Sequence, residues 1–247
     1  CYLRGIKGHL QFYVPLSNLT QNGEFDSPMT RKLMVFDLDG TVVDSRLDLC
    51  TGVNLMREDY SLGPLTLDTV CSYVGNGVRR LVERALSDAA TAPDTDEAVA
   101  RMKTHYLAHM LDETSVYPGV PAALARLHEE GLCLVVASNK PEGPSRRICE
   151  ALGLGGYLDL VLGGDSCPNM KPDPEPLLAA ARHTGTELTG AWMVGDNYTD
   201  LGAGRRAGFQ RCFCRYGFGV AGDETFDLAV DSLGDFADAI LEAPEGS

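Results

Sequence analysis

Two aspartates that could bind a cation or take part in chemistry follow the first strongly apolar run of the chain. Residues 33–36 are Leu-Met-Val-Phe, and the stretch Asp37-Leu38-Asp39-Gly40-Thr41 comes directly after them. Two carboxylates at the end of a buried strand are costly unless they are paired with a cation or used in chemistry. Gly40 permits a tight turn that brings the backbone close to a ligand. The pattern predicts a functional carboxylate pair at a strand end.

Further polar motifs stand at three later points of the chain. Ser138-Asn139-Lys140 follows the apolar run 132–137 and offers a hydroxyl and backbone N–H donors. Lys171 lies in a loop that prolines stiffen, and Asp196 and Asp200 stand at a strand end and in the first turn of the next helix. Each motif alone is common in turns and helix caps. Their order along the chain, each at or beyond a strand end, indicates one shared active site.

The elements that must position these residues alternate between strands and helices. Strands are expected over residues 33–36, 132–137, 158–162, 191–194 and 210–214, and helices over residues 121–130, 175–184 and 198–207. Repeated strand–helix units predict an α/β fold with a mostly parallel sheet covered by helices on both faces. Such sheets bind ligands beyond the carboxyl ends of their strands, where the strand order reverses.

The first crossover is unusually long and has no clear apolar strand. Residues 77–86 place Val78, Leu81 and Ala85 on one face of a helix, and a second helix is expected from Asp94 to about Asp112. The pattern predicts a helical insertion over residues 45–114, forming a small second domain over the active edge of the sheet.

The four motifs together resemble those of the haloacid dehalogenase (HAD) superfamily and, within it, the phosphoglycolate phosphatase-like hydrolases. The resemblance covers essentially residues 29–241, and the stretch from Val74 to Arg84 is also similar to the cap of those phosphatases. It implies a Rossmann-like core made of residues 29–44 and 115–247, with a helical cap domain over residues 45–114.

The resemblance also implies a role for each motif. Asp37 would be the nucleophile that forms an aspartyl phosphate, and Asp39 would act as general acid and then general base. Ser138 and the backbone of Asn139 would hold phosphate oxygens, and Lys171 would offset charge on the nucleophile and the phosphoryl group. Such roles suit phosphoryl transfer, which depends on stabilising charge on the equatorial oxygens.

Mg²⁺ is the cofactor that the resemblance implies. Its ligands would be Asp37, the backbone carbonyl of Asp39, Asp196 and Asp200. A hard cation with oxygen ligands screens the repulsion between a carboxylate and a phosphate dianion.

Two cap residues are further candidates for substrate binding. Gly77 would let the cap loop enter the core site, and Arg80 follows it closely. Because Val78, Leu81 and their neighbours already define the buried face of this helix, a solvent-exposed position for Arg80 stays an alternative.

The expected function is Mg²⁺-dependent hydrolysis of a small phosphomonoester, with 2-phosphoglycolate the best single candidate substrate. Asp39 favours phosphoryl chemistry, since the dehalogenases of the superfamily lack an acid at this position, and Thr41 fits hydrolases better than mutases. The alternatives are a β-phosphoglucomutase-like phosphoryl transfer and a catalytically inactive binding protein of the same fold. Retention of Asp37, Asp39 and Asp196 weighs against the inactive protein.

The composition and net charge of the chain limit the classes of binding partner that can be expected. The chain of 247 residues has 35 acidic against 21 basic residues and a formal net charge of -14. This balance disfavours nucleic acid and anionic membranes, and no run reaches the roughly 18 to 20 apolar residues of a membrane span. The eight cysteines form no CxxC pair and indicate free thiols in a reducing cytoplasm. A small phosphorylated metabolite is the expected partner of a monomer or homodimer.

Residues 1–28 need a separate interpretation. They carry no sustained apolar core and no basic amphipathic pattern, so they are a poor targeting signal. A natural start at Met29 would make them a non-native extension, and a genuine N-terminal arm is the alternative.

Overall fold

The structure is a computed structural model that describes residues 31–91 and 93–242. The extension predicted over residues 1–28 lies outside the described residues. Within the part that is described, no helix combines the length and the apolar character needed to pass through a bilayer.

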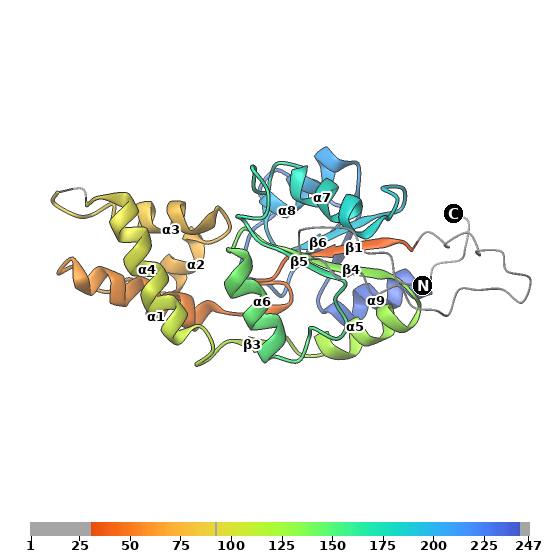
Figure 1. Ribbon diagram of the computed structural model, residues 1–247, viewed down its shortest axis with the longest axis horizontal. Coiled ribbons are helices and arrows are strands. Elements are labelled where there is room, and N and C mark those ends of the chain that lie inside the picture. Colours follow the sequence, from red (N-terminus) through yellow and green to blue (C-terminus); the bar gives the residue numbers. More distant parts are fainter. Residues whose placement is uncertain (1–30, 92, 243–247) are drawn as a thin grey trace, which may run out of the picture. The chain divides into compact units, whose positions relative to one another are not determined.

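The described chain forms a six-stranded parallel sheet with the strand order β5-β4-β1-β6-β7-β8 (Figure 1). The strands are β1 (Leu33–Phe36), β4 (Cys133–Ala137), β5 (Leu160–Leu162), β6 (Trp192–Gly195), β7 (Gln210–Cys214) and β8 (Leu228–Val230). The chain runs from β1 outward through β4 to β5, and then returns to the other side of β1 to begin β6. The strand order therefore reverses at β1, where ligands of such sheets bind.

Helices cover both faces of this sheet (Figure 1). On one face lie α5 (Val120–Glu129), α6 (Glu142–Ala151) and α9 (Leu233–Leu241), and on the other lie α7 (Glu175–Thr184) and α8 (Tyr198–Ala207). Side chains of β1 alternate between the two layers. Met34 and Phe36 pack into the first, while Leu33 and Val35 pack into the second. All four are fully buried, as expected for a strand in the centre of a covered sheet.

The predicted fold class is confirmed, and the five predicted strands and three predicted core helices are present within a few residues of their expected bounds. In the core, the elements that the sequence patterns did not single out are the edge strand β8 and the helices α6 and α9. The edge strand has only three residues, of which Val230 alone is buried, so its apolar signal is weak.

The long first crossover is helical, as predicted. It contains α1 (Arg46–Asp59), α2 (Leu67–Tyr73), α3 (Gly77–Ala85) and α4 (Thr95–His109). The last two match the predicted helices, whereas α1 and α2 were not placed individually. The two linkers of this insertion, β2 (Val43–Asp44) and β3 (Ser115–Val116), pair with each other as a short antiparallel ladder. The division of the chain into core and cap at residues 44/45 and 114/115 stays a prediction.

A buried carboxylate on α1 forms hydrogen bonds with the segment that leads into β3. Asp48, 1% exposed on α1, accepts hydrogen bonds from Thr114 N at 2.8 Å and Thr114 Oγ1 at 2.7 Å, and from Glu113 N at 3.0 Å. These bonds satisfy the buried charge and bring both ends of the insertion together.

Truncation of Phe36 is expected to lower the free energy of unfolding by about 3–5 kcal/mol, because the change leaves a cavity in a fully buried layer. The Phe36 ring is 0% exposed and meets the Phe236 ring edge to face, with centroids 6.0 Å apart. Urea unfolding of Phe36→Ala measures the loss. The matched control is Phe226→Ala, whose ring is 43% exposed and should cost less than about 1.5 kcal/mol. Equal losses for the two variants would contradict this packing.

Candidate active site

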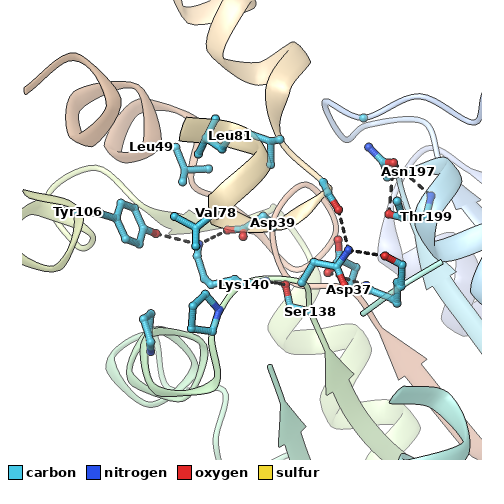
Figure 2. A pocket seen from close by; sticks show the side chains of 18 of the residues that line it. Asp37, Asp39, Leu49, Val78, Leu81, Tyr106, Ser138, Lys140, Asn197 and Thr199 are labelled. Carbon is cyan, nitrogen blue, oxygen red and sulfur yellow. Dashed lines mark hydrogen bonds and ion pairs between the residues drawn. The ribbon is translucent and has the colours of Figure 1, made fainter. Parts of the chain in front are cut away.

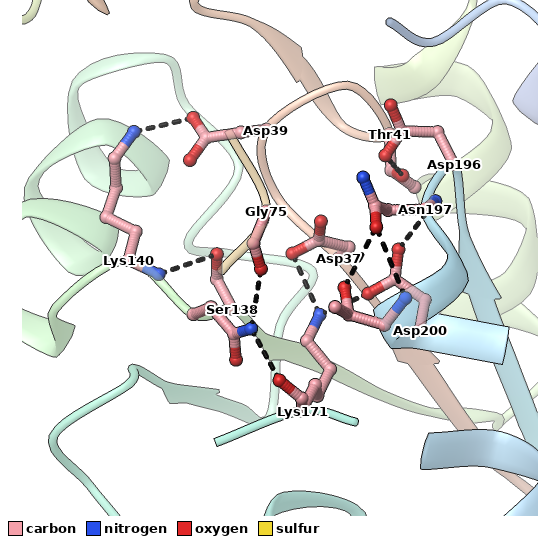
Figure 3. Close-up of polar contacts among 12 residues, drawn as sticks. Asp37, Asp39, Thr41, Gly75, Ser138, Lys140, Lys171, Asp196, Asn197 and Asp200 are labelled. Atoms are coloured by element: carbon pink, nitrogen blue, oxygen red, sulfur yellow. Dashed lines mark hydrogen bonds and ion pairs between the residues drawn. The ribbon is translucent and has the colours of Figure 1, made fainter. Parts of the chain in front are cut away.

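The polar motifs meet at the carboxyl ends of the three central strands (Figure 3). Asp37 follows β1, Ser138 follows β4, and Asp196 follows β6, while Lys171 comes from the loop before α7. Together with residues of the insertion they line a cavity of about 300 Å³. The structure thus brings together the core residues that the sequence motifs proposed: Asp37, Asp39, Ser138, Asn139, Lys171 and Asp196 line this cavity.

Lys171 is a buried ammonium between two carboxylates. Its Nζ lies 3.0 Å from Asp37 Oδ1 and 2.7 Å from Asp200 Oδ1, and its side chain is 1% exposed. Burial disfavours the charged form, but the charges of Asp200 and Asp37 outweigh it and raise the pKa of Lys171. Lys171 therefore stays a cation beside Asp37.

Asp196 is held by the backbone of the loop after β7. Its Oδ2 accepts hydrogen bonds from Gly219 N at 2.7 Å and Phe218 N at 3.0 Å. Burial, and then the nearby charges of Asp200 and Asp37, raise the pKa of Asp196 well above its usual value. Gly40 has a φ of +89°, and a Cβ there would lie 2.1 Å from Asp196 Oδ2. A glycine is therefore required for the close approach of this turn to Asp196.

Asp200 is positioned by a capping box at the start of α8. Its Oδ2 accepts a hydrogen bond from Asn197 N at 3.0 Å, while the Asn197 side chain caps the first turn of the helix. Burial raises the pKa of Asp200, and the neighbouring Lys171 opposes this rise. The spacing of Asp196 and Asp200 in the sequence thus corresponds to a strand end and a helix start that face the same site.

The acidic cluster fits a divalent cation. Oxygens of Asp37, Asp196 and Asp200 lie within 4.8 Å of one another. When all three carboxylates are ionised, as a bound cation would require, the Lys171 ammonium balances one of them and two negative charges remain in a buried site. Hard oxygen donors with this charge are the ligands that Mg²⁺ prefers. This cluster is formed by side-chain oxygens. A role for the backbone carbonyl of Asp39 as a further ligand therefore stays a prediction.

Asp39 belongs to a second polar group on the cap side of the cavity (Figure 2). Its Oδ1 accepts hydrogen bonds from Ser45 Oγ and Lys140 Nζ, both at 2.5 Å. Lys140 Nζ also donates to Tyr106 OH of α4 at 2.8 Å. Neither Lys140 nor Tyr106 was among the predicted site residues. The position of Lys140 next to Ser138-Asn139 was an available signal, whereas no local pattern marked Tyr106.

Asn139 joins three segments around the site. Its Nδ2 donates to Gly75 O at 2.7 Å and to Lys171 O at 2.8 Å. The amide therefore fixes the lysine loop and the glycine-rich loop of the insertion relative to the end of β4. Ser138 lies beside it with its Oγ directed into the region between Asp37 and Lys140 (Figure 3).

The two cap candidates differ in position. Gly77 lines the cavity, as expected. Arg80 does not line it: its side chain is 68% exposed, forms an ion pair with Glu83 Oε2 at 2.7 Å, and faces a separate open groove. The buried face of α3 is formed by Leu81, Val82 and Ala85, which turns Arg80 toward solvent. The structure therefore favours the solvent-exposed alternative for Arg80, and a role for it in substrate binding stays a prediction.

Fold and site together define an α/β protein with a buried acidic cluster at the switch point of a parallel sheet. A family model described as haloacid dehalogenase-like hydrolase matches residues 34–214. The chain belongs to this family.

Curated relatives and solved structures agree with this assignment. The phosphoglycolate phosphatase of Chromobacterium violaceum is 37% identical over 84% of this chain and 95% of its own length. That of Aquifex aeolicus is 36% identical over 76% of this chain and 86% of its own. A crystal structure from Haemophilus somnus 129pt, described as a predicted phosphoglycolate phosphatase, has a TM-score of 0.79 and 28% identity over 86% of this chain and 99% of that chain.

Proposed function

We propose that this chain is a Mg²⁺-dependent phosphomonoesterase that hydrolyses 2-phosphoglycolate through a phosphorylated Asp37. The observation that carries the proposal is the arrangement around Asp37. Its carboxylate lies beside the Lys171 ammonium within a cluster that has the charge and donor atoms for a divalent cation, and Asp39 lines the same cavity.

The first chemical step transfers the phosphoryl group to the protein. A carboxylate oxygen of Asp37 attacks phosphorus as the bond to the alcohol oxygen breaks, and Asp39 gives its proton to that oxygen. Lys171 and Ser138 donate to phosphate oxygens, where negative charge concentrates in the transition state. Mg²⁺, held by Asp37, Asp196 and Asp200, would screen the repulsion between carboxylate and phosphate dianion.

The second step releases phosphate. Asp39, now a carboxylate, takes a proton from a water molecule whose oxygen attacks phosphorus. The bond between phosphorus and Asp37 breaks and the Asp37 carboxylate is restored. Ser45 holds Asp39 Oδ1 throughout, so that Asp39 Oδ2, which no donor among the described residues reaches, is available to the alcohol or to water.

Two observations support 2-phosphoglycolate as the substrate. The relatives that match most of the chain carry the name phosphoglycolate phosphatase. The cavity next to Asp37 is confined by apolar residues of the insertion, which suits a small metabolite and not a polymer. The expected setting is the cytoplasm, with the chain as a monomer or homodimer and with no nucleic acid or membrane partner.

Phosphate release from a panel of metabolites tests this function. The panel contains 2-phosphoglycolate, hexose phosphates, nucleoside monophosphates and pyrophosphate, each with and without Mg²⁺. We expect 2-phosphoglycolate to have the highest kcat/KM and turnover to require Mg²⁺. A preference for another compound would overturn the substrate assignment, and conversion of β-glucose 1-phosphate to the 6-phosphate would favour a mutase. No turnover of any compound would favour an inactive binding protein.

A further inference from the structure

A buried lysine on the leaving-group side of the cavity has no role in the steps described so far. The Lys140 side chain is 6% exposed, and it lines the cavity at the point where Asp39 and Tyr106 meet. Its Nζ lies 4.8 Å from the centroid of the Tyr106 ring, besides the hydrogen bond to the hydroxyl. Tyr106 thus holds the ammonium from the cap side.

One N–H group of the Lys140 ammonium has no hydrogen-bond acceptor among the described residues. A lysine carries three N–H donors. Two of them reach Asp39 Oδ1 and Tyr106 OH, and no third acceptor is found among the described residues. A buried donor without an acceptor is unfavourable, so a ligand oxygen at this place would be stabilised.

The position of Lys140 defines which part of a substrate it would meet. Asp39 is the group that protonates the leaving oxygen, so the alcohol half of the ester must lie next to it. From Asp39, hydrogen bonds lead first to Lys140 and then to Tyr106 on α4 (Figure 2). Around them the wall is apolar, formed by Leu49, Val78 and Leu81. An apolar wall strengthens the attraction between an ammonium and an anion because it lowers the local dielectric.

The other lysines of the cavity are less suited to this part of the substrate. Lys171 is engaged by Asp37 and Asp200 on the phosphate side. Lys103 lies on α4 three residues before Tyr106, is exposed, and forms no ion pair with any described residue. Of the three lysines that line the cavity, Lys140 is therefore the one that is both buried and paired with Asp39.

We infer that Lys140, held by Tyr106, binds a carboxylate on the leaving alcohol and so selects phosphate esters of short 2-hydroxy acids. The inference rests on the proposed function and assigns its substrate preference to particular atoms. In such an ester the carboxylate is on the carbon that carries the leaving oxygen. The ammonium of Lys140 can therefore donate hydrogen bonds to Asp39 and to the substrate carboxylate at the same time.

The test compares two esters of the same length that differ in the carboxylate, 2-phosphoglycolate and 2-hydroxyethyl phosphate. For Lys140→Met we expect kcat/KM for 2-phosphoglycolate to fall about 10–100-fold more than for 2-hydroxyethyl phosphate. Tyr106→Phe keeps the ring and removes one bond to Lys140, so a smaller fall of about 3–10-fold with the same selectivity is expected. This milder variant keeps the inference testable if Lys140→Met folds poorly.

The matched control is Lys103→Met, which removes the other cap-side ammonium of the cavity. An equal fall for both esters in Lys140→Met would show that Lys140 only orients Asp39, and would overturn the inference. If Lys103→Met, and not Lys140→Met, lost the preference for 2-phosphoglycolate over 2-hydroxyethyl phosphate, the substrate carboxylate would be bound by Lys103. This result would also overturn the inference. Equal hydrolysis of both esters by the parent protein would refute the inference alone, whereas no hydrolysis of either ester, with turnover of another phosphomonoester, would refute the proposed substrate as well.

Discussion

Asp37→Asn is expected to lower kcat for phosphomonoester hydrolysis by at least about 10⁴-fold, because an amide cannot act as the nucleophile of the first step. The substitution is nearly isosteric and removes one negative charge from a buried group of three carboxylates. The thermal midpoint of the metal-free variant is therefore expected to be no lower than that of the parent. Single-turnover kinetics with 2-phosphoglycolate and a thermal melt measure the two effects.

The control for this variant is Asp231→Asn, since Asp231 is paired with Arg215 on the surface and its side chain is 77% exposed. Its kcat should remain within about twofold of the parent, as is usual for surface changes. Full activity of Asp37→Asn would contradict a covalent role for Asp37, whatever else the site does.

Removal of the divalent cation is expected to lower kcat by about 10³-fold or more, with recovery on addition of Mg²⁺. A cation that binds only the folded state also raises the thermal midpoint. This shift should be present in the parent protein and strongly reduced in Asp196→Asn, which loses a charged ligand oxygen. An asparagine at position 196 can still accept the hydrogen bonds of Phe218 N and Gly219 N, so the loop should keep its place.

Asp227→Asn serves as the matched control for the metal site. Asp227 pairs with Arg211, and its side chain is 41% exposed. The thermal shift caused by Mg²⁺ should be unchanged in this variant. An undiminished shift in Asp196→Asn, or full activity after exhaustive chelation, would contradict the assignment of the acidic cluster to a cation.

The central part of the fold was predictable from the sequence because its signals are local. The run before Asp37 is apolar at every position, and a strand buried on both faces has this appearance. The helix from Tyr198 is preceded by Asn197 and followed by Gly208, which mark its two ends. Since parallel strands end at one edge, Asp37, Ser138 and Asp196 could be expected to meet.

Other features depend on contacts between distant segments and could not be predicted in the same way. The pairing of Lys140 with Tyr106 joins the end of β4 to a helix of the insertion, and nothing in either local sequence indicates the other. Arg80 follows a glycine loop that does enter the cavity, yet the turn of α3 directs its side chain to Glu83. In contrast, Leu233, Phe236 and Ala237 follow the spacing of a helix face, so α9 could have been found.

The stereochemical course of phosphoryl transfer tests the central claim most directly, because each in-line displacement inverts the configuration at phosphorus. The substrate would be a 2-phosphoglycolate analogue with a chiral, isotopically labelled thiophosphoryl group, hydrolysed in isotopically labelled water. Transfer first to Asp37 and then to water comprises two displacements and predicts retention of configuration in the released thiophosphate. Inversion would show a single displacement by water and would contradict a phosphorylated Asp37.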